Sequence, residues 1–341
     1  AIDTELYKLV TFEMLVESGV FVAVNTLLAG AIMEGSRIKG VIAESRAGRE
    51  AILAKSFVDC TAYGDLAAFA GARYTEPNDY PVVNSMGVGG VNVERFYDAL
   101  QAQGAVSQLA RGARSGKDGQ IVRVQTRSKG LPAEYWEAAG KIGLALVTTT
   151  VHDDYFMFIK MGFKMPVSPT DRDAVSQAEL ELRKRQVKAI ELFRKYMPGC
   201  EKAFIARTSP SLNIRRARVI ACDYDITRSD VLDGKHFDDD IMAYGFHDNA
   251  PRLQIKNGGT YGIPYKALRV ARIENLLASG MLITSHHDAH MSTRNTVCCM
   301  GQGQGAGTAA ALCAARNCGT RELPYPVLRD ALLKAGVYLE S

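Results

Sequence analysis

Four glycines at alternate positions constrain the fold of this chain more than any other stretch. In CCMGQGQGAGTAAALCAA (298–315), a run of small helix-forming residues follows directly on Gly301, Gly303, Gly305 and Gly307. Each glycine in a helix costs about 1 kcal/mol relative to alanine, so the pattern is an expensive way merely to begin a helix. We therefore expect a phosphate, a flat ring or another helix close to this backbone. All three exploit missing Cβ atoms, and the first two also use free N–H groups at a helix N-terminus.

Composition indicates a soluble chain with a large core. Its 341 residues are 47% hydrophobic, which is enough for two lobes or for one domain with a large insertion. The net charge of +4 gives no reason to expect a nucleic-acid partner. No apolar run has spanning length, and the start AIDTELYKLV does not resemble a signal peptide. The seven cysteines form no CxxC pairs, so free thiols in a reducing, cytoplasmic compartment are expected.

Hydrophobic periodicity predicts an α/β chain in three parts. A helix capped by Asp3 and stopped at Gly19 leads into strands over 20–28, 37–45 and 50–60, which together form a β-meander. The middle holds a strand at HDDYFMFIKMGF and a long amphipathic helix that ends at Pro198-Gly199. After residue 250 the α/β texture returns, with a last short helix in ELPYPVLRDALLKAG. The expected domains are residues 1–75, 76–250 and 251–341.

The stretch VDCTAYGDLAAFAGA (58–72) predicts a second place for a ligand. An apolar strand gives way there to Thr, Gly and Asp and then to an alanine-rich helix. Ligand sites of open α/β sheets lie at such carboxyl ends of strands.

The glycine stretch also satisfies the dinucleotide pattern G-x-G-x-x-A at Gly301, Gly303 and Ala306. That fingerprint requires a strand immediately before it and a second, acid-ended strand after it. Here the preceding strand ends near Ser285, and a helix towards the end of the chain follows. The context therefore disfavours a pyrophosphate loop.

Several stretches, taken in order, resemble FAD-dependent oxidoreductases of the glutathione-reductase-like flavoprotein fold. The segment DTELYKLVTFEMLVESGVFVAVNTLLAGAI is similar to the family's helix and strand on the adenine side of FAD. KSFVDCTAYGDLAAFAGARY is similar to its D-A-T-G-D-G-D-L-A segment, and SLNIRRARVIACDYDITRSDVLDGKHFDDDI to its G-V-R-E-S-R-R-I-x-G-D-Y segment. YGIPYKAL, NLLASGMLIT and MSTRNTVCCMGQGQGAGTAAAL are similar to its closing block. The resemblance implies a partial FAD-binding domain with a β-meander and an inserted α+β substrate or cap domain.

The chain departs from this family at its front end. The strand, G-x-G-x-x-G turn and helix that open the family's fold have no counterpart, and Ala62 and Tyr63 replace the expected Gly and Asp. Three explanations stay open. The chain is a fragment, a second chain supplies the ADP-binding βαβ unit, or FAD has been lost.

The resemblance implies a cofactor, FAD, and a set of residues that hold it. A helix N-terminus at the pyrimidine edge of the flavin places dipole and N–H donors where negative charge appears on reduction, each contribution being about 0.3–1 kcal/mol. Tight helix packing is the alternative for the same glycines. The implied cofactor residues are Gly280, Gly303, Gln304, Gly305, Ala306 and Gly307 on the flavin side, with Leu28, Thr61 and Gly64 on the adenine side.

Three of the six histidines lie in SHHDAH, as His286, His287 and His290. The i,i+4 pair His286 and His290 could bind a metal only in a helix, and the position between strand and helix predicts a loop, so we expect no metal. An imidazole beside a flavin can remove a proton while hydride leaves the substrate carbon. His287 and His290 are the candidates for this base. Hydrogen bonding of these histidines to the backbone is the alternative.

Arginines near the glycine stretch are candidates for the substrate side. By the same resemblance, Arg294 and Arg215 face the active-site side of the flavin, where a guanidinium suits a carboxylate or another polar oxygen pair. His247 and Asp248 in YGFHDNAP form a further polar pair that could reach a substrate. Solvated surface charge is the alternative for each arginine.

Two classes of function follow. In the first, the chain transfers hydride between FAD and a polar small organic substrate. In the second, it is a non-catalytic binding or scaffold subunit that keeps the fold and holds no cofactor. The retained glycines favour the enzyme, the substituted D-A-T-G-D-G-D residues favour the scaffold, and a nicotinamide-only dehydrogenase fits less well than either.

Overall fold

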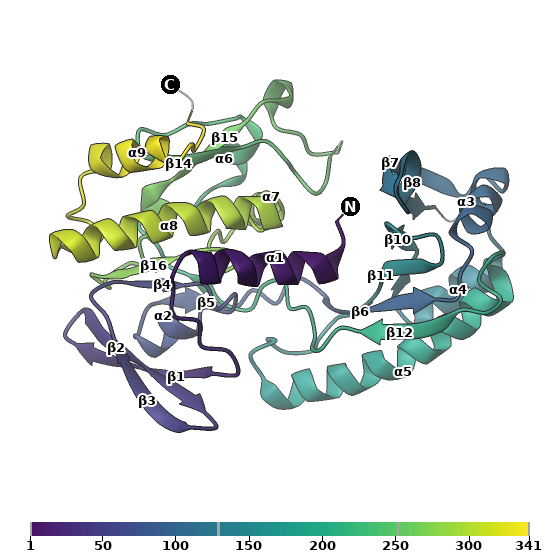
Figure 1. The fold of residues 1–341 in the computed structure, drawn as a ribbon, viewed down its shortest axis with the longest axis horizontal. Coiled ribbons are helices and arrows are strands. Elements are labelled where there is room, and N and C mark those ends of the chain that lie inside the picture. The colour runs from purple at the N-terminus through teal and green to yellow at the C-terminus, as the bar shows by residue number, and fades with distance from the viewer. Residues whose placement is uncertain (1, 128–129, 251, 340–341) are drawn as a thin grey trace. The chain divides into compact units, whose positions relative to one another are not determined.

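The chain divides into two compact units. The computed structural model describes residues 2–127, 130–250 and 252–339 (Figure 1). Unit 1 comprises residues 1–22 and 80–215, and unit 2 comprises residues 23–79 and 216–341. The chain therefore passes between the units three times, after residues 22, 79 and 215. The first passage separates residues 1–22 from the rest of the expected 1–75 domain. The second lies close to the expected boundary after 75, and the third lies at 215/216 instead of 250/251. The later segment joins unit 2 because α6 (Arg228–Leu232) and β14 (Asp240–Tyr244) pack there with β15 (Tyr261–Pro264), α7 (His287–Thr293) and α8 (Thr296–Arg316).

Unit 1 is built on the four-stranded antiparallel sheet β12-β6-β11-β9, with a second sheet of order β10-β8-β7. Its elements are α1 (Thr4–Glu17), β6 (Val82–Gly89), α3 (Val93–Ala102), β7 (Val106–Arg114), β8 (Lys117–Thr126), α4 (Ala133–Lys141), β9 (Leu144–Ala145), β10 (Val147–Thr149), β11 (Tyr155–Phe163), α5 (Arg172–Tyr196) and β12 (Phe204–Thr208). The predicted strand and long helix of the middle region are therefore confirmed as β11 and α5.

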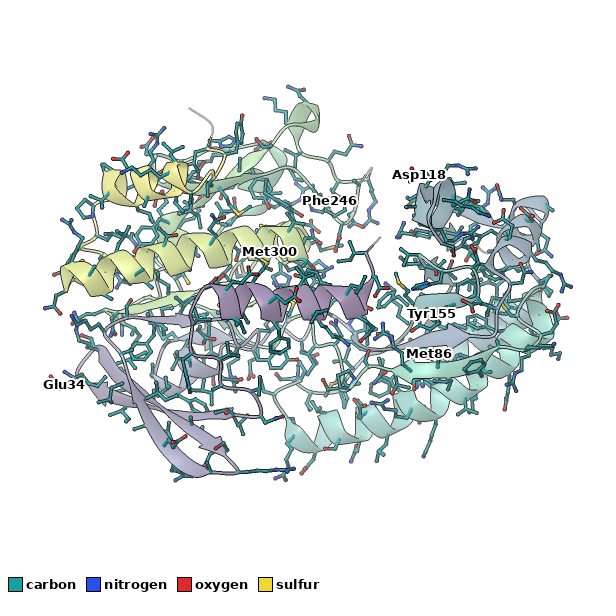
Figure 2. The ribbon with its side chains drawn as sticks, viewed as in Figure 1. Glu34, Met86, Asp118, Tyr155, Phe246 and Met300 are labelled. Atoms are coloured by element: carbon teal, nitrogen blue, oxygen red, sulfur yellow. The ribbon has the colours of Figure 1, made fainter. Side chains whose placement is uncertain are left out.

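The core of unit 1 lies between its main sheet and α5. Met86 of β6, labelled in Figure 2, is buried, and Gln186 of α5 donates to Asn84 of the same strand at 2.7 Å. Aromatic rings fill the space beside the sheet, where Phe96 lies 4.9 Å from Phe156 between ring centroids. The single tryptophan, Trp136, packs edge-on against buried Tyr135 in α4.

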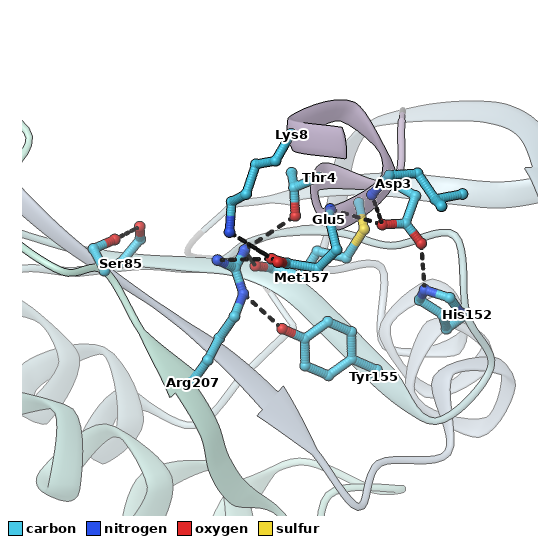
Figure 3. Close-up of polar contacts among 11 residues, drawn as sticks. Asp3, Thr4, Glu5, Lys8, Ser85, His152, Tyr155, Met157 and Arg207 are labelled. Carbon is cyan, nitrogen blue, oxygen red and sulfur yellow. Dashed lines mark hydrogen bonds and ion pairs between the residues drawn. The ribbon is translucent and has the colours of Figure 1, made fainter. Parts of the chain in front are cut away.

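The start of α1 is attached to the main sheet of unit 1 by polar contacts (Figure 3). Asp3 caps the helix by accepting from the backbone N–H groups of residues 5 and 6, which confirms the predicted N-cap. The same carboxylate lies 3.4 Å from His152. Arg207 of β12 donates to the hydroxyl of Tyr155 at 2.9 Å and reaches Thr4 at 3.5 Å.

Unit 2 contains the meander and the glycine helix. Its elements are β1 (Leu27–Glu34), β2 (Arg37–Ser45), β3 (Gly48–Leu53), β4 (Phe57–Asp59), α2 (Asp65–Phe69), β5 (Tyr74–Thr75), β13 (Val219–Ile220), α6 (Arg228–Leu232), β14 (Asp240–Tyr244), η1 (Lys256–Gly258), β15 (Tyr261–Pro264), η2 (Tyr265–Ala267), β16 (Leu276–Ala278), α7 (His287–Thr293), α8 (Thr296–Arg316) and α9 (Tyr325–Lys334).

The β-meander is confirmed as the antiparallel sheet β1-β2-β3, but its limits differ from the prediction. Residues 20–26 form no strand, and β1 begins only at Leu27. A strand needs a hydrogen-bonding partner, and none lies beside this apolar segment in the part of the chain that the structure describes. The predicted strand 50–60 is two strands, because β3 ends the meander while β4 pairs in parallel with β16.

Two apolar clusters form the core of unit 2. One surrounds α8 and includes Tyr261, Tyr265, Leu328 and Leu332, so the confirmed C-terminal helix α9 packs there. The other lies around β4, β16 and α2. Because β4 and β16 run in parallel, their carboxyl ends meet at one edge of the unit, beside α8 (Figure 1).

Candidate functional site

A cavity of about 210 Å³ lies where these two strand ends meet α8. Ala278 of β16 pairs with Asp59 of β4, and the amide of Ser279 donates to the carbonyl of Asp59 at 3.0 Å. Both strands end here, and carboxyl ends of strands are where ligands bind in open α/β sheets. The cavity is lined by Cys60, Ala62, Ser279, Gly280, Met281, Cys299 and Gly303.

The loop after β4 is held in shape by Asp59. This buried carboxylate accepts from the amide and hydroxyl of Thr61 at 2.9 and 2.7 Å, and from the amide of Ala67 at 2.9 Å. The Thr61 hydroxyl in turn accepts from the amide of Asp65 at 2.9 Å. Thr61, predicted to contact the cofactor, therefore has its hydroxyl engaged inside the loop, one residue from the cavity-lining Cys60.

Two neighbouring residues of this loop have left-handed backbone conformations. Gly64 has φ +69°, and a Cβ there would lie 2.6 Å from the side chain of Ile220. Its glycine is thus required by packing as well as by φ. Ala62, which replaces a glycine of the resembling family, also has positive φ (+65°) although it carries a Cβ. Leu28, predicted on the adenine side, packs in β1 against the core cluster around β4 and β16.

The glycine stretch lies inside α8, so the prediction that it opens the helix is wrong. The helix begins at Thr296 with Asn295 as N-cap, more than one turn before Gly301. The free amides of the helix N-terminus are therefore not those of the glycines. Residues 296–300, which have ordinary side chains, form the first turn instead.

The four glycines serve two different faces of α8. A Cβ on Gly301 would lie 2.4 Å from the sulfur of Met242, and one on Gly305 would lie 2.5 Å from Cδ1 of Ile241. These two glycines, spaced i,i+4, let α8 pack closely on β14. A Cβ on Gly303 or Gly307 would meet nothing within 4 Å, and Gly303 lines the cavity. Both interpretations from the sequence, close helix packing and an open approach, thus apply to the same helix.

Other predicted flavin-side residues lie away from this cavity lining. Ala306 is buried in the core around α8, while Gln304 and Gly307 are exposed. Gly280, by contrast, lines the cavity with φ +105° and has nothing within 4 Å of a Cβ position. Of the predicted cofactor residues, Gly280 and Gly303 are the two brought together here.

Gln302 joins the strand end to the helix. Its Oε1 accepts from the amide of Gly280 at 2.8 Å, and its Nε2 donates to the carbonyl of Thr293 at 2.8 Å. The side chain is fully buried, so both bonds lie out of water. Sequence reasoning missed this residue, although a glutamine among the glycines, on the core side of a predicted helix, is a signal for such a clamp.

The histidine segment is a helix where the sequence predicted a loop. His286 is the N-cap of α7, and its ring accepts from the amide of Asp288 at 3.2 Å. His290 is fully buried, and its Nε2 lies 2.9 Å from the carbonyl of Met281. Burial, and then the positive charge of Arg216, lower the pKa of His290 to about 3, so this ring is neutral at pH 7.

His287 is paired with a carboxylate from a distant part of the sequence. Its Nδ1 lies 2.7 Å from Oδ2 of Asp79, and the buried guanidinium of Arg216 donates to both oxygens of the same carboxylate. Burial opposes ionisation of Asp79, but the hydrogen bonds from Arg216 and His287 outweigh it and lower the pKa of Asp79. No sequence signal marked Asp79, because the pairing depends on tertiary structure alone.

The remaining predicted residues have structural partners. His247 is buried, with Nε2 2.8 Å from the carbonyl of Asp288 and Nδ1 accepting an amide at 3.0 Å. Arg294 forms an ion pair with Asp248. Arg215 is half-buried and is the last residue of unit 1. Among the residues that the structure describes, no three His, Cys, Asp or Glu side chains are grouped to hold a metal.

The family model described as "FAD dependent oxidoreductase" matches residues 1–332. The chain belongs to this family. A comparison with curated proteins found no match. In addition, none of the helices in the described part of the chain is long and apolar enough to cross a membrane.

Solved structures similar to this FAD-dependent oxidoreductase family member are distant. A geranylgeranyl bacteriochlorophyll reductase-like protein of Thermoplasma acidophilum is 11% identical, with a TM-score of 0.44, over 95% of this chain and 56% of that one. Flavin-dependent brominase Bmp2 is 10% identical, with a TM-score of 0.38, over 94% and 56%. The chain thus spans a little over half the length of these proteins, and the likeness carries no further argument.

Proposed function

We propose that this chain is the flavin- and substrate-facing part of an FAD-dependent oxidoreductase, which transfers hydride between FAD and a polar small organic substrate. The observation that carries the proposal is the division of the α8 glycines. Gly301 and Gly305 are explained by packing on β14, whereas Gly303 is not, because its open side lines the cavity. A glycine in a helix interior costs about 1 kcal/mol relative to alanine. At Gly303, unlike exposed Gly307, the open side faces a cavity that a ligand can occupy.

The residues of the cavity fit the ring end of FAD better than its phosphate end. Gly280 and Gly303 leave two walls without Cβ atoms, which suits a flat ring. The loop around Ala62 offers no G-x-G-x-x-G turn for the pyrophosphate. When bound, FAD supplies the hydride acceptor and donor of the reaction. The chain's own contribution here is to shape the wall and exclude water.

His287 is the proposed proton-transferring residue. Asp79 fixes the ring through Nδ1, and the His287 side chain is 42% exposed, so the oriented imidazole is accessible for proton exchange with a substrate. His290 is less suited to this role, because it is fully buried and donates to a backbone carbonyl. Arg294 and Arg215 remain proposals for holding a substrate oxygen.

A second polypeptide segment is proposed to cover α1. The apolar side chains of Leu6, Leu9, Phe12 and Met14 are each half or more exposed, and no described residue of the helix is buried. Large apolar side chains gathered on an exposed helix normally mark a surface that other protein covers. A βαβ unit, supplied by another chain or another segment, fits this need and the absent phosphate turn together. Co-expression with such a unit should raise FAD uptake, and Leu9→Glu should cancel that gain.

The scaffold function stays the second candidate. It is favoured by Ala62, which holds a left-handed conformation where the family has glycine, next to the position expected to approach the cofactor. A scaffold has no need of the open side of Gly303. The two functions therefore differ in whether that space is used.

Titration with FAD, with and without a βαβ partner, tests the proposal. Bound FAD should give a flavin absorption band at about 450 nm that stays with the protein through gel filtration. Gly303→Leu fills the cavity and should weaken binding at least tenfold. Gly307→Leu is the matched control, because it makes the same change one turn later on an exposed site and should bind FAD normally. Equal binding by both variants, or a protein that stays colourless throughout, would favour the scaffold.

The role of His287 needs a reducing substrate. His287→Asn should slow flavin reduction about 10²- to 10⁴-fold without releasing flavin. His286→Asn is the matched control, since asparagine keeps the N-cap acceptor of α7 and the rate should not change. Unaltered reduction in His287→Asn would remove this residue from the mechanism.

A further inference from the structure

Two thiols line the cavity beside Gly303. Cys60 follows β4, and Cys299 lies in the first turn of α8. Both residues line one small cavity of about 210 Å³, and a disulfide spans Cα separations of about 4.4–6.8 Å. The two side chains come from elements far apart in sequence and therefore share this small space only in the folded chain.

The charge of a Cys60 thiolate affects the pKa of the Cys299 thiol. Burial raises the pKa of Cys299 to about 11, the guanidinium of Arg294 opposes the rise, and a Cys60 thiolate adds to it. Cys60 is exposed as a residue, yet loss of water around its thiol and the charge of Asp59 raise its pKa as well. As whole residues, Cys60 is exposed and Cys299 is half-buried.

The neighbouring cysteine of α8 points elsewhere. Cys298 is fully buried in the core around α8, and its sulfur accepts from Nε2 of Gln302 at 3.3 Å. Cys299 instead donates weakly to the carbonyl of Thr293 at 3.8 Å and lines the cavity. Adjacent positions on one helix therefore separate a core thiol from a cavity thiol.

We propose that Cys60 and Cys299 form a dithiol modification site, which takes a small-molecule disulfide such as oxidised glutathione and closes to a disulfide across the cavity. The Cys60 thiolate attacks one sulfur of the small disulfide, forming a mixed disulfide and releasing one thiol. The Cys299 thiolate then attacks the Cys60 sulfur, forming the intramolecular bond and releasing the second thiol. The protein pair loses two electrons and two protons, and the small disulfide gains them.

Closure changes the cavity. The bond joins the end of β4 to the first turn of α8 and places two sulfur atoms across the space beside Gly303. Both thiols are mostly protonated at pH 7, so closure is slow there. While the pH stays below the thiol pKa, the rate rises about tenfold for each unit of pH increase.

The experiment treats the reduced full chain with oxidised glutathione at about pH 8.5, where more thiolate is present, blocks remaining thiols and maps peptides by mass spectrometry. A Cys60–Cys299 cross-link without retained glutathione is the expected product. Cys299→Ser should stop at a stable glutathione adduct on Cys60. Cys298→Ser is the matched control, one residue away, and should still give the cross-link.

Three results would overturn the proposal. They are a glutathione adduct on Cys60 with Cys299 unmodified, no reaction at either residue, and a cross-link confined to Cys313 and Cys318, which are also near neighbours. The wild-type map alone distinguishes these outcomes, so the test stands even where a variant folds poorly. No flavin is needed, and failure here leaves the proposed function unaffected.

Discussion

Alanine substitutions along α8 should change stability in opposite directions on its two faces. Each Gly→Ala change in a helix interior gains about 1 kcal/mol from helix propensity. At Gly303 and Gly307 a Cβ meets nothing within 4 Å, so that gain should appear in full. At Gly305 the new Cβ would lie 2.5 Å from Cδ1 and 3.0 Å from Cβ of Ile241.

The clash at Gly305 decides the sign of its effect. Forcing a methyl group into a packed interface costs about 1–3 kcal/mol, which exceeds the propensity gain, so Gly305→Ala should destabilise unit 2 by up to about 2 kcal/mol. Gly301→Ala should be closer to neutral, because the obstructing Met242 side chain is flexible. Ile241→Val removes the nearest carbon and should return most of the loss at Gly305.

Urea unfolding followed by far-ultraviolet circular dichroism measures these differences. The expected order of stability is Gly303→Ala and Gly307→Ala above wild type, Gly301→Ala near it and Gly305→Ala below it. Four equal gains would refute the close packing of α8 on β14. A Gly305→Ala loss that Ile241→Val does not relieve would refute Ile241 as its cause.

Three further predictions concern the loop after β4 and two carboxylates. Ala62→Gly should stabilise the chain by about 0.5–1 kcal/mol, seen as a higher melting temperature, because it relieves a left-handed alanine. Asp79→Asn removes the carboxylate from buried Arg216 and should cost about 2–3 kcal/mol in urea, somewhat less than a fully buried pair because Asp79 is partly exposed. The pKa of Asp79 is lowered in the folded chain. The wild type therefore has this stabilisation at pH values above the unfolded-state pKa near 3.8 and loses it as the pH falls through the folded-state pKa. Asp79→Asn should show no such loss in acid. Burial raises the pKa of Asp240 to about 6, so the folded chain holds this proton more tightly than the unfolded chain does. The free energy of unfolding should therefore fall by up to about 3 kcal/mol as the pH rises from about 4 to above 6. An equal fall in Asp240→Asn would contradict this assignment.

Local signals predicted the elements well where they are self-sufficient. The N-cap at Asp3, the amphipathic α5 and the short α9 all follow from spacing and capping, and the structure confirms them. The predicted start of α8 is wrong, because the helix begins after its N-cap Asn295 and not at the glycines. The loop predicted for SHHDAH is helical because the His286 ring itself caps it.

Contacts between distant segments could not be predicted from one sequence. The pairing of His287 with Asp79 and the clamp of Gln302 on Gly280 depend on how strands and helices assemble. The division of the glycines by face was likewise hidden, since i,i+4 spacing shows which residues share a face but not what that face meets. Gly280 and Gly303 were implied by the family resemblance, and the structure places both in the lining of one cavity.

The single tryptophan allows the unfolding of unit 1 to be followed separately from the unfolding of the whole chain. Trp136 belongs to unit 1, while α8 and the cavity belong to unit 2, so tryptophan emission follows the melting of one unit and is silent about the other. Combined with a backbone signal from the whole chain, it can reveal whether the two units unfold together. If they do not, damage to the glycine helix would lower the backbone transition and leave the emission curve where it was.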